Sequence, residues 1–141
     1  MRVIYQSKNG KTRKLAEAIA EAAGHIECND LEHGYDVSKI AEGELIFLGS
    51  GVYGGKSGDK VITFVRELKK SKKKVRLALF GSSNGKGKAV KALRKITTKN
   101  GFNPIGEDYN CPGKFLFFHP SRPNQADINA ARNYAERMTK N

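Results

Sequence analysis

Short apolar segments alternate with longer amphipathic segments along this chain, and this alternation constrains the fold more than any other feature. Apolar runs such as 45–48 have the length and composition of buried parallel strands. Apolar residues three and four positions apart predict helices between these runs. The expected strands are 2–6, 25–28, 44–49, 75–80 and a region 104–118 that is interrupted at 110–113. Such alternation predicts an α/β protein of the doubly wound kind, with helices on both faces of a parallel sheet.

Polar, glycine-containing loops follow three of the expected strands. They cover residues 7–12, 50–58 and 82–87. In open parallel sheets, ligands bind beyond the carboxyl ends of the strands, near the point where the strand order reverses. The three loops are therefore the expected ligand-binding region of the chain.

The first of these loops has the chemistry of a phosphate site. Its hydroxyl and amide groups precede a helix whose N-terminal N–H groups and dipole favour an anion, and Lys11 adds positive charge. The segment Gly10-Lys11-Thr12 also resembles the end of a P-loop, but that motif requires a glycine at the position of Tyr5. Binding of one phosphate is therefore expected, and nucleotide hydrolysis is not.

The second loop contains Gly49-Ser50-Gly51-Val52-Tyr53-Gly54, which matches the letters of a dinucleotide fingerprint. That fingerprint needs a helix that begins at the motif and an acidic residue about 20 positions later. Here the helix is expected to begin later than the motif. The acidic residue is missing too, because the chain has no Asp or Glu between Leu68 and Gly106. The glycines of this loop are better explained by close approach of the backbone to a flat ligand.

The excess positive charge lies in one segment. The chain has a net charge of +12, and residues 69–99 contain twelve lysines and arginines without one acidic residue. The other basic and acidic residues balance at 14 each. In the helix expected after the third loop, basic residues recur on one face, at Lys88, Lys91, Lys95 and Lys99. This face is either a docking surface for an acidic macromolecule or a solvated surface that aids solubility.

Several other functions are not expected from the residues present. Cys28 and Cys111 are far apart and in no CxxC motif, which fits a reducing, cytoplasmic location. The histidines lack the spacing of a metal site, and we find no pairing of a nucleophile with a base. We expect no targeting segment and no membrane span. If the protein catalyses a reaction, an organic cofactor is expected to carry the chemistry.

In its loops and in the order of its elements, the chain resembles the flavodoxin family over its whole length. The resemblance implies one domain over residues 1–141, with a five-stranded parallel sheet in the order 2-1-3-4-5 and bound flavin mononucleotide (FMN). Ser7, Gly10 and Thr12 match the phosphate loop of the family, whereas Asn9 and Lys11 depart from it.

The resemblance also implies roles for the other two loops. Tyr53 would stack on the flavin, and Gly54 falls where family members turn a peptide over so that its carbonyl bonds the reduced flavin. Gly55 departs from the acidic residue that is common there, and the third loop lacks a stacking aromatic. The expected FMN-binding residues are Ser7, Lys8, Asn9, Gly10, Lys11, Thr12, Gly51, Val52, Tyr53, Gly54, Gly55, Ser82, Ser83, Asn84 and Gly85.

The expected function is electron transfer through bound FMN, as a carrier rather than an oxidoreductase, with an acidic ferredoxin-like protein or reductase docking on the basic face. No side chain is expected to be catalytic, and no metal is expected. Two alternatives remain. The chain could be a flavodoxin-fold binding module that has lost FMN and binds an acidic protein or, less favoured, nucleic acid. It could also be a small FMN-dependent reductase of a quinone or porphyrin-type substrate.

Overall fold

A computed structural model describes residues 1–83, 87–112 and 123–140. It contains a five-stranded parallel sheet in the order β2-β1-β3-β4-β5, as expected. The strands are β1 (Arg2–Gln6), β2 (Glu27–Asp30), β3 (Leu45–Ser50), β4 (Arg76–Ser83) and β5 (Tyr109–Pro112). The fold is the doubly wound α/β arrangement that the alternation of segments predicts.

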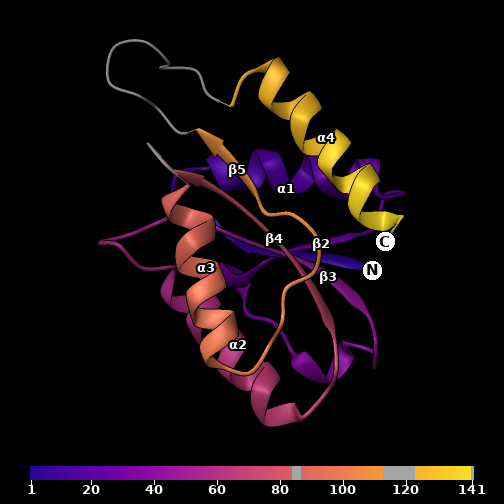
Figure 1. Ribbon diagram of the computed structural model, residues 1–141, viewed down its shortest axis with the longest axis vertical. Helices are drawn as coiled ribbons and strands as arrows, with labels where there is room; N and C mark the ends of the chain where they lie inside the picture. Colours follow the sequence, from indigo (N-terminus) through magenta and orange to yellow (C-terminus); the bar gives the residue numbers. More distant parts are fainter. Residues whose placement is uncertain (84–86, 113–122, 141) are drawn as a thin grey trace.

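Four helices cover the two faces of the sheet (Figure 1). They are α1 (Lys11–Ala22), α2 (Asp59–Ser71), α3 (Lys88–Lys99) and α4 (Gln125–Thr139). Helices α1 and α4 pack together on one face over Val3, Phe47 and Phe80, and helices α2 and α3 cover the other face over Ile4, Leu48 and Leu79. Because both faces are covered, β3 is buried along its whole length.

Some boundaries differ from the sequence predictions. The second strand begins at Glu27 rather than at residue 25, because Gly24 and His25, which follow the end of α1, both have positive φ. Two short 3-10 turns, Leu31–His33 and Val37–Lys39, connect β2 to β3. The last strand contains only Tyr109–Pro112. Residues 104–108 precede it outside the strand, and the expected part 113–118 lies outside the described residues.

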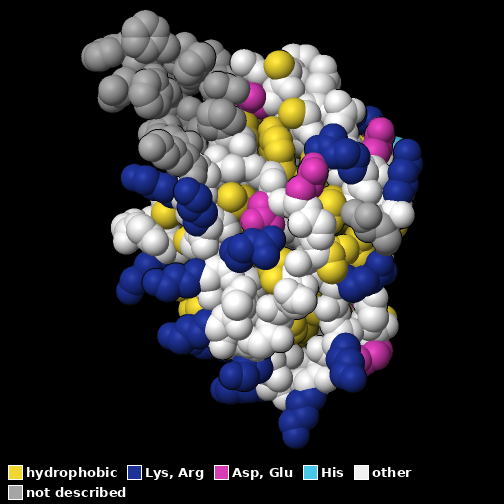
Figure 2. Space-filling view, viewed as in Figure 1, with side chains coloured by type: hydrophobic (Ala, Val, Ile, Leu, Met, Phe, Trp, Pro, Cys, Tyr) yellow, Lys and Arg dark blue, Asp and Glu magenta, His cyan; other side chains and the backbone are white. Residues whose placement is uncertain are grey.

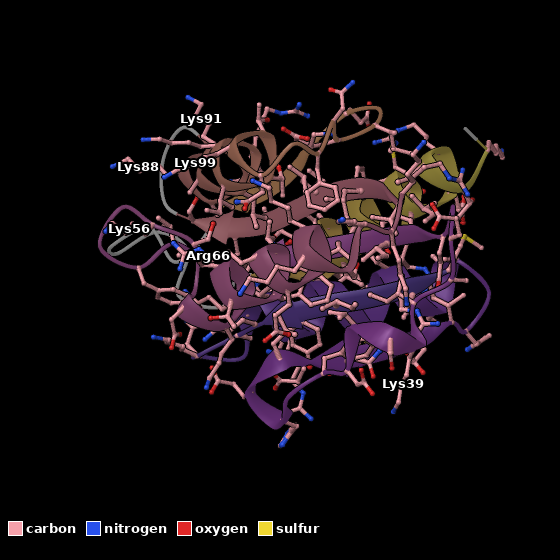
Figure 3. All side chains as sticks on the ribbon, turned by 90° about the horizontal axis from the view of Figure 1, so that it is seen from below. Lys39, Lys56, Arg66, Lys88, Lys91 and Lys99 are labelled. Atoms are coloured by element: carbon pink, nitrogen blue, oxygen red, sulfur yellow. The ribbon has the colours of Figure 1, made fainter. Side chains whose placement is uncertain are left out.

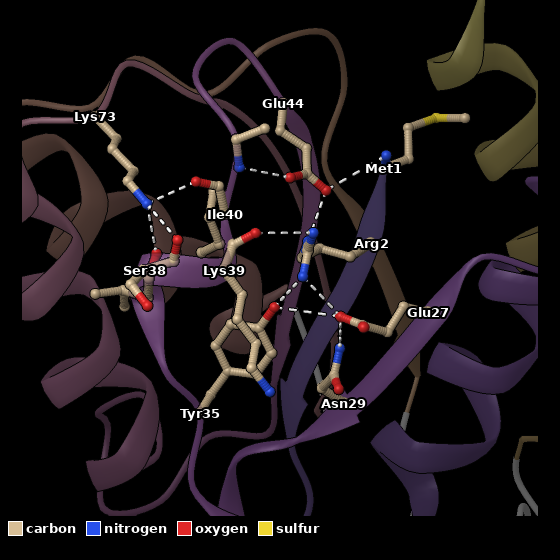
Figure 4. A network of polar contacts seen from close by, with 12 residues as sticks. Met1, Arg2, Glu27, Asn29, Tyr35, Ser38, Lys39, Ile40, Glu44 and Lys73 are labelled. Atoms are coloured by element: carbon tan, nitrogen blue, oxygen red, sulfur yellow. Dashed lines mark hydrogen bonds and ion pairs between the residues drawn. The ribbon is translucent and has the colours of Figure 1, made fainter.

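A polar network at the amino ends of the strands holds the end of the sheet opposite to the predicted ligand loops (Figure 4). The Arg2 guanidinium donates to Glu44 at 2.6 Å and to Glu27 at 2.8 Å. Burial raises the pKa of Glu44, but the hydrogen bonds from Arg2 and Ala41 and the nearby positive charges together outweigh burial and lower the pKa overall. The Lys73 ammonium donates to three carbonyls of residues 37–40, so this lysine of the basic segment has a structural role.

At the carboxyl end of the sheet, the side chain of Gln6 joins β1 to α2. Its carbonyl oxygen accepts from the backbone N–H groups of Lys60 at 2.8 Å and Val61 at 3.2 Å, which lie in the first turn of α2. Its amide donates to Glu32 at 2.6 Å and Asp59 at 2.8 Å. Gln6 is fully buried, so these bonds satisfy groups that water does not reach.

Replacing Gln6 by Ala should lower the free energy of unfolding by about 2–4 kcal/mol, because two N–H groups of α2 lose their acceptor at about 1–3 kcal/mol each. Urea unfolding followed by circular dichroism measures the change. Gln125→Ala, at an exposed position that starts α4, is the control and should change stability by less than about 0.5 kcal/mol. Equal losses in the two variants would contradict the role of Gln6.

Candidate functional site

Three loops meet at the carboxyl edge of the sheet because their strands are parallel and in register. Gln6 at the end of β1 is paired with Ser50 at the end of β3, and Ser50 is paired with Gly81 in β4. The loops that follow these strands are therefore neighbours, although they are far apart in the sequence. In Figure 1 this is the edge toward which the arrows of β4 and β5 point.

The first loop is held by its own side chains. Ser7 Oγ accepts from the Gly10 N–H at 3.0 Å, and Asn9 Oδ1 accepts from the Lys11 N–H at 3.1 Å. Gly10 has a φ of +84°, a conformation that glycine adopts without strain. The backbone bonds of α1 begin with the Lys14 N–H and the Gly10 carbonyl, so the N–H groups of Thr12 and Arg13 precede the helical ladder. These two groups can meet an anion at the positive end of the helix dipole.

Two hydroxyls lie beside this helix start. Thr12 Oγ1 and Ser82 Oγ are 3.2 Å apart, and both side chains are buried. They bring together the first and third of the predicted loops. Because each hydroxyl both donates and accepts, the pair can bond a phosphate oxygen after a small rotation.

The second loop forms a tight turn at Tyr53-Gly54-Gly55-Lys56. The Tyr53 N–H donates to the Lys56 carbonyl at 2.7 Å, and the Lys56 N–H donates back at 3.1 Å. Both central residues have positive φ, +58° for Gly54 and +79° for Gly55, which is the pattern of a type I′ turn. A Gly-Gly pair permits this conformation without a steric cost. The glycine at position 55, which departs from the family pattern, thus has a conformational reason here.

Ser50 holds both ends of this loop. Its hydroxyl donates to the Gly51 carbonyl at 2.7 Å and accepts from the Gly58 N–H at 3.0 Å. Neither Ser50 nor Gln6 was among the residues predicted from the sequence. Both stand at the end of an apolar strand, and a buried polar residue at that position is the signal that could have identified them.

Tyr53 bridges the first and second loops. Its hydroxyl accepts from the Lys8 N–H at 3.3 Å, and the Lys8 ammonium lies 4.7 Å from the centre of its ring. Burial raises the pKa of Tyr53, although the hydrogen bonds from Lys8 and Gly51 act in the opposite direction. A Cβ on Gly51 would lie 2.7 Å from the Tyr53 hydroxyl, so a larger residue there would displace the Tyr53 side chain. Val52 lies beside this group, half-buried.

The third loop is shorter than expected, because β4 continues through Ser82 and Ser83. The Ser83 hydroxyl donates to Asn110 Oδ1 at 3.1 Å and accepts from the Ala89 N–H at 3.0 Å. Ser83 therefore caps α3 from the preceding strand, and its hydroxyl is already used. Asn84 and Gly85 lie outside the described residues, and their predicted contacts with FMN remain predictions.

The site offers groups that bind and orient a ligand rather than groups that exchange protons with it. Among residues 1–83, 87–112 and 123–140, no group of three His, Cys, Asp or Glu side chains could hold a metal ion. The groups present are helix N–H groups, hydroxyls, an aromatic ring and glycine backbone. This combination suits an anion attached to a flat ring system.

Comparison with known proteins identifies the same fold. A model of the flavodoxin domain family matches residues 2–107. An uncharacterized protein of Methanocaldococcus jannaschii is 31% identical over 151 aligned residues, which cover 99% of this chain and 97% of the relative. Oxidised flavodoxin 1 of Bacillus cereus superposes with a TM-score of 0.76 at 21% identity, over 99% of this chain and 96% of the other.

Two further solved structures are similar. A flavodoxin from the domain Archaea has a TM-score of 0.76 at 20% identity and covers 99% of this chain and 97% of the other. Rubredoxin oxygen:oxidoreductase of Desulfovibrio gigas also has a TM-score of 0.76, at 19% identity, and this chain covers 35% of that longer protein. At these identities, the likeness to solved structures shows the fold alone.

Replacing Gly51 by Ala should displace the Tyr53 hydroxyl and expose it, so the pKa of one tyrosine should fall toward its ordinary value. Spectrophotometric titration of tyrosinate measures this, and Tyr53→Phe identifies the titrating group by removing it. Val52→Ala, at the neighbouring half-buried position, is the control, because it adds no atom near the Tyr53 hydroxyl. An unchanged titration in the Gly51 variant would show that Tyr53 is not held by this contact.

Proposed function

The chain belongs to the flavodoxin family, and from this membership we propose that it binds FMN at the three loops and transfers electrons in the cytoplasm. The observation that carries this proposal is the convergence of the α1 N-terminus, the Thr12 and Ser82 hydroxyl pair and Tyr53 at one edge of the sheet. We also propose that residues 1–141 form one domain. Bound FMN would supply one- and two-electron transfer, which no side chain of the site provides.

The residues at the first loop fit the phosphate of FMN. Thr12 and Arg13 would donate backbone N–H groups, and Thr12 and Ser82 would donate hydroxyls. Lys8 and Lys11 add positive charge beside them. Ser7 and Asn9 already hold the loop in shape, so their contribution is to keep the N–H groups in place before the ligand arrives. Such preorganisation lowers the entropic cost of binding.

The residues of the second loop fit the ring system of FMN. Tyr53 offers an aromatic face for stacking, and the Gly54–Gly55 turn presents backbone that lacks side chains and is exposed. Gly51 and Val52 would border the ring, and Gly54 would be the residue whose carbonyl responds to reduction. The role of this chain is thus to bind and orient the cofactor, which favours a carrier over a reductase of a quinone-type substrate.

The basic face of α3 is the proposed docking surface. Lys88 and Lys91 are exposed and lie next to the third loop, and Figure 3 shows them together with Lys56, Arg66 and Lys99 on one side of the molecule. The space-filling view shows the same concentration of positive charge over α3 and α2 (Figure 2). Arg94 is partly neutralised by Asp108 at 2.6 Å. The predicted contribution of Lys86 lies outside the described residues.

Positive charge near the exposed edge of a flavin would steer an acidic redox partner toward it. Nucleic acid is less favoured, because the exposed surface of α3 has no aromatic side chain on which bases could stack. Within the described part of the chain, every helix is too short or too polar to cross a membrane. We therefore propose an acidic ferredoxin-like protein or reductase as the partner.

One observation favours a second candidate, a binding module without FMN. The Lys8 ammonium covers one face of the Tyr53 ring, and the Tyr53 hydroxyl is bonded to the backbone of the first loop. These contacts connect the loops without a cofactor. A flavin that stacks on that face would have to displace the ammonium.

The protein should bind FMN one-to-one and at least about tenfold more tightly than riboflavin, because each charge-assisted hydrogen bond to the phosphate contributes about 1.5–3 kcal/mol. Calorimetric titration of both ligands measures the difference. Thr12→Val should reduce the preference for FMN, whereas Thr98→Val, at an exposed position on α3, is the control. Equal affinities would reject the phosphate site, and no binding of either ligand would support the module.

Reversing the charge of Lys88 and Lys91 to Glu should slow electron exchange between the FMN-loaded protein and an acidic ferredoxin by about tenfold at low salt. The loss should shrink as salt rises, since these charges are screened over about 8–10 Å. Stopped-flow absorbance measures the rates. Figure 3 shows Lys39 on the other side of the molecule, and Lys70 lies in the last turn of α2. Lys39→Glu with Lys70→Glu therefore makes the same change of charge elsewhere and should have a smaller effect. Equal slowing in both variants would reject α3 as the docking surface.

A further inference from the structure

A groove between α2 and α3 opens beside the second loop. It contains a cavity of about 260 Å³. Its walls come from Lys56 and Ser57 of the loop, from the first two turns of α2 and from the middle and end of α3. The groove is thus separate from the phosphate loop, which precedes α1 on the other face of the sheet.

Positive charge surrounds this groove. Four cationic side chains line it, and no acidic residue does: Lys56, Arg66, Lys95 and Lys99. Among the described residues, none of these four forms an ion pair with a carboxylate, although several arginines elsewhere do. Like charges gathered around one hollow repel one another, and an anion in the groove would relieve this repulsion.

The floor of the groove is apolar. Ile62, Ala92 and Ile96 line it, and all three are only half-buried, so they present apolar surface to solvent. Helical spacing alone would place Ile62 and Ile96 in the core, but Phe64 of α2 and Thr97 of α3 are buried instead. This apolar strip is therefore left for another molecule to cover.

A buried hydroxyl without a partner lies in the wall. Ser57 is 5% exposed, and its Oγ has no hydrogen-bond partner among the described residues. Buried hydroxyls are usually satisfied, and an unsatisfied one costs about 1–3 kcal/mol in mutational data. Ser57 belongs to the same loop as the exposed Gly54–Gly55 turn, so a small movement of this loop could present the hydroxyl to a ligand.

We propose that this groove binds a small organic polyanion, a molecule with two or more phosphate or carboxylate groups on an apolar body. The body would cover Ile62, Ala92 and Ile96, and the anionic groups would pair with Arg66 and Lys95 from opposite walls. A cavity of about 260 Å³ is close to the lower end of the usual range for small-molecule sites, about 300–1,000 Å³. This volume suits a small ligand rather than a macromolecular surface.

Gly55, one of the predicted FMN-binding residues, also lines the groove, so a ligand there would contact the same loop as FMN. The proposal does not depend on FMN, because none of the cations of the groove belongs to the predicted cofactor site. Failure of FMN binding and failure of binding in the groove are therefore separate results.

Adenosine diphosphate is a suitable probe, with adenosine and pyrophosphate as its two halves. Titrations by calorimetry should use the full chain, with and without saturating FMN. Adenosine diphosphate should bind at least about tenfold more tightly than either half, since the charged and apolar parts of the groove act on one molecule. NMR spectra of the isoleucine methyl groups should show shifts at Ile62 and Ile96 but not at the buried Ile4.

Arg66→Gln combined with Lys95→Gln should weaken binding of adenosine diphosphate by about tenfold or more. Lys69→Gln with Lys70→Gln removes the same charge from exposed positions outside the groove and should have little effect. Ala92→Leu should weaken binding by filling the floor without changing the charge. Equal binding of pyrophosphate and adenosine diphosphate, or full binding by the Arg66 and Lys95 variant, would overturn the proposal.

Discussion

The geometry of the ligand-binding edge depends on the hydrogen bonds that the buried side chain of Gln6 makes to the start of α2. Gln6 lies at the end of the strand that precedes the phosphate loop, and its side-chain carbonyl oxygen accepts the N–H groups that begin α2. A Cβ on Gly58 would collide with this oxygen, so the start of α2 is packed directly against Gln6. One buried amide therefore sets the position of the first loop relative to the helix that follows the second.

A polar side chain at the end of the strand also accepts a backbone N–H group in β3 and in β4. Ser50, the last residue of β3, accepts the Gly58 N–H, and Ser83, the last residue of β4, accepts the Ala89 N–H. Gly58 and Gly87, which precede α2 and α3, have no side chain to cap these helices, so the strand ends supply the acceptors. The loop between β3 and α2 can then be rich in glycine, which leaves backbone available to a ligand.

Some positively charged side chains are bonded within the protein, and others are left to interact with a partner. Lys73 binds three carbonyls, and Arg2 and Arg94 pair with carboxylates, whereas the lysines of α3 lie unpaired among the described residues. The sequence pattern locates the excess of positive charge in residues 69–99 but does not separate these groups. Asp108, the carboxylate partner of Arg94, lies outside that segment and reaches Arg94 only through the fold.

The sequence by itself determined the class of fold and the positions of the three loops, because these depend on local periodicity and on residues close in the chain. The Asn124 cap of α4, with its reciprocal bond to Asp127, is likewise local, because it joins residues three positions apart. Only the tertiary structure decided that Gln6, Ser50 and Ser83 cap elements from the strand ends, and that α2 and α3 leave a cationic groove between them. These contacts join residues that are distant in sequence, and the register of the parallel strands, rather than any local pattern, brings them within hydrogen-bonding distance.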